Sequence, residues 1–443
     1  MSTLEVIHPH CAGIDIGSTS YHVCALDNEV KIFGTYHEDC EQLVYYLESL
    51  SIEVVAMEST GVYWYHLYEV LDSAGFTVYL VNPRQTRQRV EGRKSDVQDA
   101  IWIRDLLRHG LLRNSFIPDT MVRELRTFAR LRQDHVRAKA QQENLMNKAL
   151  ISMNVRISEA LSSLTTVSGL KMMRAIVAGE RDASVLLSLC DIKIIKNKSA
   201  SVLKALKGNF NAGHIFTLKQ ALEAWDFYGD QINSCDEQMA TCLDELGKSY
   251  QEEVNSKPKP SRTTNMPKID GLHEKVVKCF SGTNPCELTG ISDYSCVRLI
   301  AELGTDLSAW KDVKQFTSWL GLAPKSKQSG KMKKNVKSPP TIAGQIFKDA
   351  AAGLLNARDN PLGEIGRSIR ARSGPTVAIK AMARRIAVSY YYLIKEGVKF
   401  VEKGVDQLRQ KQEQKKLQLM QAWAKEMNYV EIVVREQSPA TSS

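Results

Sequence analysis

Four carboxylates in the first hundred residues could together bind divalent metal ions. Asp15 lies in an apolar segment that runs into Gly-Ser-Thr-Ser, and Glu58 lies near the end of a second apolar segment. Asp96 and Asp99 are three residues apart in the sequence KSDVQDA, so on a helix they share one face. Clustered carboxylates repel one another, and Mg²⁺, or Mn²⁺ in its place, would offset that repulsion. Two such ions about 4 Å apart can stabilise the attacking and leaving oxygens of a phosphodiester exchange.

Each of these acids also has an ordinary structural explanation. Asp15 could cap the turn that follows it, Asp96 could interact with a helix dipole, and Glu58 could be a surface residue at a strand end. A strand–Asp–Gly–Thr hairpin also opens the sugar-kinase and actin-like ATPases. The sequence has neither the second Asp-Gly-Gly phosphate hairpin nor the Gly-Gly adenosine loop of that class. Four acids in elements that can bring them together therefore indicate a metal site more strongly than any one of them does.

The alternation of strand and helix patterns predicts elements that would bring the four acids together. Strands are expected over 12–17, 21–27, 29–37, 52–59 and 76–82, and helices over 40–50, 61–75 and 94–110. The order β-β-β-α-β-α-β-α is that of the α/β ribonuclease-H-like (RuvC-like) fold, a mixed sheet with helices on its faces. In that fold the first and fourth strands are neighbours, and a helix crosses their ends, so the acids can converge.

Composition favours a polyanionic partner and a reducing compartment. The 443 residues predict two or three domains, and the net charge of +9 suits nucleic acid better than an acidic partner. The nine cysteines include no C-x-x-C pair, which favours reduced thiols over disulfides or a zinc site. No signal peptide or apolar run of membrane-spanning length is apparent. We therefore expect a cytoplasmic, nucleoid-associated protein.

Four regions are expected along the chain. Residues 1–117 form the RuvC-like domain, and 118–260 form a helical or coiled-coil spacer and linker, with one long helical pattern over 118–165. A single solvated helix would explain that pattern equally well. Residues 261–400 predict a mainly α C-terminal domain, and 401–443 predict a tail that is charged and helical at first, then disordered.

Two segments of the C-terminal domain and one of the first domain suit contact with nucleic acid. Residues 288–304 resemble a helix-hairpin-helix, a unit that offers backbone N–H groups to phosphates, although an ordinary helical hairpin would read the same way. Residues 325–337 predict a loop with six lysines and no acid. The candidate phosphate contacts are Arg84, Arg87, Arg89, Arg93 and Lys94, together with Lys325, Lys327, Lys331, Lys333 and Lys334. Such contacts give affinity and position but not sequence choice.

Several motifs together resemble one family. The segments GIDIGSTSYHVCAL, VVAMESTGVYWYHL, VNPRQTRQ and RKSDVQDAIWIRDLL are similar to the DEDD-type insertion-sequence transposases with a RuvC-like N-terminal domain. The C-terminal half resembles the same family through ELTGISDYSCVRLIAELG, KQSGK and the apolar helices that follow. The resemblance spans roughly residues 10 to 400. The sequence departs from many relatives in VKSPPTIAGQIF, which lacks their Lys/Arg-Gly-Asn element.

The resemblance implies a site-specific DNA recombinase that moves its own element. It implies that Asp15, Glu58, Asp96 and Asp99 bind Mg²⁺ and that Ser329 is the nucleophile, with Ser326 and Ser338 close enough to be alternatives. It further implies a structured bridge RNA that selects donor and target DNA, and a tetramer of paired dimers. The phosphoserine bond would conserve the energy of the broken DNA bond for rejoining. A Holliday-junction nuclease that uses metal-activated water, or a non-catalytic nucleic-acid-binding protein, remains an alternative.

Overall fold

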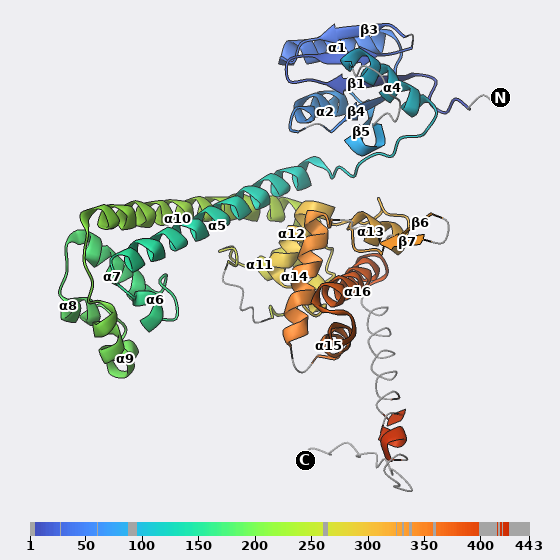
Figure 1. The fold of residues 1–443 in the computed structure, drawn as a ribbon. Coiled ribbons are helices and arrows are strands. Elements are labelled where there is room, and N and C mark those ends of the chain that lie inside the picture. Colours follow the sequence, from blue (N-terminus) through green and yellow to red (C-terminus); the bar gives the residue numbers. More distant parts are fainter. Residues whose placement is uncertain are drawn as a thin grey trace. The chain divides into compact units, whose positions relative to one another are not determined.

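The computed structural model divides into two compact units, residues 1–117 and 118–443 (Figure 1). It describes residues 5–26, 28–59, 61–86, 95–259, 265–324, 326–329, 332–335, 339–357, 360–397, 414, 417–418 and 420–424. For residues 84, 85, 326–329, 332–335 and 361 it describes the backbone but not the side chains. Each unit is considered by itself below.

The first unit contains a mixed sheet of five strands in the order β3-β2-β1-β4-β5. The strands are β1 (Cys11–Ile16), β2 (Tyr21–Cys24), β3 (Val30–Phe33), β4 (Val54–Glu58) and β5 (Thr77–Val81). The first three pair antiparallel, whereas β1, β4 and β5 are parallel. The predicted adjacency of the first and fourth strands is confirmed, and so is the α/β character of this unit.

Helices and apolar side chains cover both faces of the sheet. The helices are α1 (His37–Ser49), α2 (Trp64–Ser73), the short α3 (Pro83–Thr86) and α4 (Asp96–Arg108). Alternate residues of a strand point to opposite faces. On one face Ala12 and Ile14 join a core with residues of α1 and α2. On the other face Cys11 packs with Ile103 and Leu107 of α4. Figure 1 shows α1, α2 and α4 around the sheet.

Helix α4 approaches β1 so closely that only glycine fits at residue 13. A Cβ atom there would lie 2.3 Å from the Arg104 backbone nitrogen and 2.5 Å from the Ala100 carbonyl oxygen. The Arg104 side chain secures the helix further, because it donates to the Ala25 carbonyl oxygen at 3.0 Å and to Asn28 Oδ1 at 2.6 Å. The sheet and α4 are therefore held in one fixed relation at this point.

The second unit contains two long helices that run side by side (Figure 1), α5 (Thr120–Ser152) and α10 (Ala212–Gly247). The prediction of one helical pattern over 118–165 is wrong in extent. The helix ends at Ser152, and Asn154 adopts a left-handed φ of 56°, which ends an α-helix. The alternative of a single solvated helix is also wrong, since α5 packs along α10.

Short helices lie between these two in the sequence. They are α6 (Ile157–Ala160), α7 (Val167–Ala178), α8 (Ala183–Ser188) and α9 (Ile192–Ala205). Their apolar faces share one core with the end of α5 and the beginning of α10, through residues such as Met146, Met172, Val202 and Leu218. The predicted spacer region thus has a hydrophobic core of its own and is not a single extended helix.

The remaining helices form the end of the second unit. They are α11 (Leu272–Cys279), the 3₁₀ turn η1 (Pro285–Glu287), α12 (Asp293–Leu303), α13 (Val313–Trp319), α14 (Ile342–Asn356), α15 (Pro361–Ser373) and α16 (Pro375–Glu396). The segment likened to a helix-hairpin-helix follows η1, bends at Gly290, whose φ is 89°, and continues as α12. Most of the predicted tail lies outside the described residues.

The predicted lysine loop is instead a two-stranded antiparallel ribbon. It consists of β6 (Ser326–Ser329) and β7 (Met332–Asn335), in which Ser329 pairs with Met332. Only two residues separate the strands in the sequence, which is the shortest common length of a hairpin connection. The proposed serine loop is therefore a strand end, and its backbone position is fixed by pairing.

A buried ion pair ties the long helices to the C-terminal helices. Arg132 of α5 and Asp236 of α10 form this pair, with side chains that are 1% and 2% exposed. Asp236 also accepts from the Lys268 backbone N–H at 2.9 Å, and Arg132 donates to the Tyr294 hydroxyl of α12 at 3.0 Å. A buried ion pair is stable only when such further hydrogen bonds satisfy its partners.

All nine cysteines are free and buried. Within the described residues, no helix combines the length and apolar character needed to cross a membrane.

Replacement of Gly13 by alanine should displace α4 from β1. The added Cβ would meet backbone atoms that cannot rotate away, so we expect a loss of about 1–3 kcal/mol in the free energy of unfolding. Chemical denaturation of the purified chain measures this loss. Gly353→Ala is the matched control, because a Cβ on this α14 residue meets nothing within 4 Å and should be neutral or slightly stabilising. Equal stability of Gly13→Ala and the natural chain would contradict the close contact.

Candidate metal and catalytic site

Asp15, His22 and Asp96 come together at one end of the sheet. One potential ligand atom of each residue lies within 4.8 Å of those of the other two. Asp15 and His22 pair directly across β1 and β2, and Asp96 is the first residue of α4. His22 Nδ1 is buried and has no hydrogen-bond partner among the described residues. An orphaned ring nitrogen beside two carboxylates is a donor set that fits a divalent cation.

The contact at Gly13 explains why Asp96 reaches Asp15. Gly13 and Asp15 are two residues apart on a strand, so both face α4. Ala100 touches Gly13, and Asp96 precedes Ala100 by four residues, about one helical turn. A step of one turn along α4 and a step of two residues along β1 are each about 6 Å. The carboxylates of Asp15 and Asp96 therefore lie at the same end of the contact between β1 and α4.

Glu58 ends the neighbouring strand β4. Ile14 pairs with Met57, and Asp15 and Glu58 each follow that pair by one residue. Thr86 is buried, and its hydroxyl donates a short hydrogen bond to Glu58 Oε2. The Thr86 carbonyl oxygen in turn accepts from the indole N–H of Trp102 on α4 at 2.8 Å. This chain of contacts fixes the Glu58 carboxylate relative to α4.

A side-chain cap at the start of α4 fixes the first turn, which carries Asp96 and Asp99. The Ser95 hydroxyl accepts from the Gln98 backbone N–H at 3.3 Å, and the Asp99 backbone N–H donates to the Ser95 carbonyl oxygen. Asp96 and Asp99 thus lie in the first turn, where the positive end of the helix dipole favours carboxylates. Among the described residues the close group contains Asp15 and Asp96, whereas Glu58 and Asp99 lie outside it.

The remaining predicted residues belong to less completely described segments. Ser329 ends β6 in the second unit, and its side chain is not among those described. Lys327, Lys333 and Lys334 lie in the same two-stranded ribbon, and Arg84 lies in α3. Arg87, Arg89, Arg93, Lys94, Lys325 and Lys331 lie outside the described residues, as does Ser338.

Sequence reasoning missed two residues of this site, His22 and Thr86. The signal for His22 was present, because Asp15 and His22 are equally distant from the four residues Gly17–Ser20 that connect the strands. The Gly17 backbone N–H donates to the Ser20 carbonyl oxygen at 3.0 Å and closes this turn. A hairpin of that length places residues 15 and 22 opposite each other. Thr86 carried no comparable signal, since its contact with Glu58 spans 28 residues.

Comparison with protein families connects both units to one enzyme class. A model of the DEDD-type IS110 transposase N-terminal domain matches residues 12–154, and a model described as "Transposase IS116/IS110/IS902 family" matches residues 286–344. The two matches support an IS110-type transposase. A search of curated proteins found no match to it.

The transposase is therefore an enzyme that cuts and joins DNA strands, and its DEDD-type domain indicates the use of divalent metal. The first matched span contains the four predicted acids and His22, and the second contains Ser329 and the ribbon.

Replacement of Thr86 by valine should loosen the Glu58 carboxylate of the transposase. The change keeps the side-chain shape and removes the donor, so we expect a loss of about 1 kcal/mol in the free energy of unfolding and weaker binding of Mn²⁺. Denaturation and calorimetric titration of Mn²⁺ measure the two effects. Thr86→Ser keeps the hydroxyl and is the control. If the Thr86→Val and Thr86→Ser variants bind Mn²⁺ equally well, the hydrogen bond from Thr86 does not position Glu58.

Proposed function

We propose that this transposase cuts and rejoins DNA through a covalent serine intermediate. In this proposal Ser329 is the nucleophile, and Asp15, Glu58, Asp96 and Asp99 bind Mg²⁺ or Mn²⁺. The observation that carries it is the gathering of Asp15 and Asp96 with the unpartnered His22 Nδ1 at the end of β1. The strand order and directions of the first unit further support a ribonuclease-H-like domain.

The proposed reaction exchanges one phosphodiester for another. The Ser329 hydroxyl oxygen forms a bond to phosphorus, the bond from phosphorus to one DNA oxygen breaks, and that strand leaves with a free hydroxyl. Attack by a hydroxyl of the recipient strand on the phosphoserine then restores a DNA bond and releases the serine. Metal held by the carboxylates would polarise the phosphate and stabilise charge on the attacking and leaving oxygens.

The side chains of the chain have separate roles in this scheme. Asp15 and Asp96 would supply oxygen ligands, with His22 as a nitrogen donor, while Thr86 holds Glu58 in position. Because β6 pairs with β7, the Ser329 backbone is preorganised. The lysines of the ribbon would attract the DNA backbone, along with Arg84, Arg87, Arg89, Arg93 and Lys94.

We further propose that a structured bridge RNA selects the DNA and that the active form is a tetramer of paired dimers acting on DNA in the cytoplasm. The family resemblance and the net charge of +9 support a nucleic-acid partner. Phosphate contacts of basic residues carry no sequence information, so a pairing RNA would supply the specificity.

A covalent-adduct assay tests the serine chemistry. Full-length protein with its co-purifying RNA is mixed with Mg²⁺ and labelled DNA that spans the ends of its element, and adducts are sought on a denaturing gel. We expect an adduct that falls by at least about 10³-fold in Ser329→Ala and in Asp15→Ala, as for other catalytic groups that act as a unit. Ser326→Ala, at the other end of β6, is the matched control and should retain the adduct.

Two outcomes would overturn the assignment of Ser329. Cleavage without an adduct that persists in Ser329→Ala but not in Asp15→Ala would indicate a junction nuclease that uses water. An adduct lost in Ser326→Ala and kept in Ser329→Ala would identify Ser326, and not Ser329, as the nucleophile. Ribonuclease treatment should abolish the adduct if RNA guides the enzyme, and an unchanged adduct would argue against guidance.

A further inference from the structure

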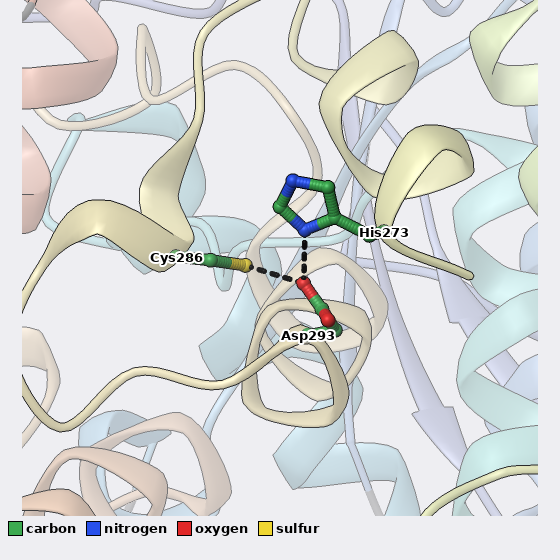
Figure 2. Close-up of side chains that lie close together, drawn as sticks. All are labelled: His273, Cys286 and Asp293. Carbon is green, nitrogen blue, oxygen red and sulfur yellow. Dashed lines mark hydrogen bonds and ion pairs between the residues drawn. The ribbon is translucent and has the colours of Figure 1, made fainter. Parts of the chain in front are cut away.

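A second cluster of metal-binding side chains lies in the second unit, apart from the carboxylates of the first. Figure 2 shows His273, Cys286 and Asp293 pointing toward one another, with Asp293 between the other two. His273 Nδ1 lies 2.7 Å and Cys286 Sγ 2.9 Å from the same oxygen, Asp293 Oδ1. Cys296 adds a second thiol, whose Sγ is 3.2 Å from Cys286 Sγ. All four residues are at least nine-tenths buried.

Three separate elements bring these donors together. His273 comes from α11, Cys286 from η1, and Asp293 and Cys296 from the first turns of α12. The spacing H-x₁₂-C-x₆-D-x₂-C contains no short pair such as C-x-x-C. This is why the sequence favoured simple reduced thiols over a zinc site.

Three of these donors are close enough to share one small ion, which would spread them slightly. With Zn–S near 2.3 Å and Zn–N near 2.0 Å, donor atoms around tetrahedral zinc lie about 3–4 Å apart. The potential ligand atoms of His273, Cys286 and Asp293 lie within 4.8 Å of one another, whereas Cys296 lies outside this group, with its Sγ next to that of Cys286. In the proposed site the Cys296 side chain would rotate toward the ion. Two thiols, one imidazole and one carboxylate are ligand types that zinc accepts.

The other ring nitrogen of His273 is also held. Ser256 Oγ lies 2.9 Å from His273 Nε2. Histidines that bind metal through one nitrogen are usually oriented by a hydrogen bond at the other. Ser256 therefore fixes the ring so that Nδ1 faces Asp293 and the thiols.

We propose that His273, Cys286, Asp293 and Cys296 bind one structural zinc ion that fastens α11, η1 and α12 together. Zinc binding displaces the protons of the two thiols, and these protons pass to solvent. The site has four protein ligands and is buried, as structural zinc sites are, so it takes no part in DNA chemistry. The proposal is independent of the serine mechanism.

The competing explanation is a hydrogen-bond network without metal. In that network His273 and Cys286 both donate to Asp293, which accounts for those three residues. It leaves Asp293 as a buried carboxylate whose ion-pair partner among the described residues is His273. A divalent ion bound to this carboxylate would neutralise its charge, which is why we favour zinc.

Metal content and cobalt spectra of the full-length protein test the proposal. Protein purified without chelator should contain about one zinc per chain by elemental mass spectrometry. After exchange with Co²⁺ it should show a thiolate-to-cobalt charge-transfer band, which oxygen ligands do not produce. Chelator should lower the unfolding temperature by several degrees. We expect Cys286→Ser to lose the zinc and to weaken the band.

Two controls separate this site from other metal sites and other thiols. Cys279→Ser removes a buried thiol of α11 that bonds to the Leu243 carbonyl oxygen instead, and it should keep the zinc and the band. Asp15→Asn alters the carboxylate site of the first unit and should also keep them.

Three results would overturn the zinc site. One is natural protein with neither zinc nor a charge-transfer band, which decides the question even if Cys286→Ser fails to fold. Another is a band of full strength in folded Cys286→Ser. The third is a mass lower by two hydrogens with Cys286 joined to Cys296, which would identify a disulfide instead.

Discussion

The geometry of the carboxylate site depends on one close contact, that of α4 with β1 at Gly13. Because residue 13 has no side chain, the helix backbone lies directly on the strand. Asp15 lies two residues from Gly13 along the strand, and Asp96 lies about one turn from Ala100 along the helix. A larger residue at position 13 would separate the two elements and with them the two acids. The site is thus set by backbone packing, and the hydrogen bond from Thr86 to Glu58 refines it.

The two units carry different parts of the chemistry proposed for this transposase. The first supplies carboxylates at the end of a rigid sheet, where the proposed divalent cation would offset their mutual repulsion. The second supplies a serine at the end of a short paired strand, within a segment rich in lysine and free of acids. Phosphoryl transfer needs little beyond positioning and charge, and in the proposed reaction these segments would provide both.

Buried polar groups hold the helices of the second unit at their junctions. Arg132 and Asp236 join α5 to α10 and reach α12 through Tyr294. The cluster around Asp293 joins α11, η1 and α12 in a similar way. Such networks are directional, so they fix helix positions that apolar contacts alone would leave adjustable.

The sequence by itself determined the order of the elements in the first unit, the neighbouring positions of β1 and β4, and the candidate acids. Hydrophobic periodicity is a local pattern and can be read along the chain. The resulting order of elements indicated a fold in which the first and fourth strands are neighbours. The length of the turn after Asp15 already indicated that His22 lies opposite it. Only the tertiary structure decided that Thr86 contacts Glu58 and that the lysine segment is a paired ribbon. It also gathered His273, Cys286 and Asp293 from separate elements. These contacts depend on register and on helix docking, which residues far apart in the sequence settle together.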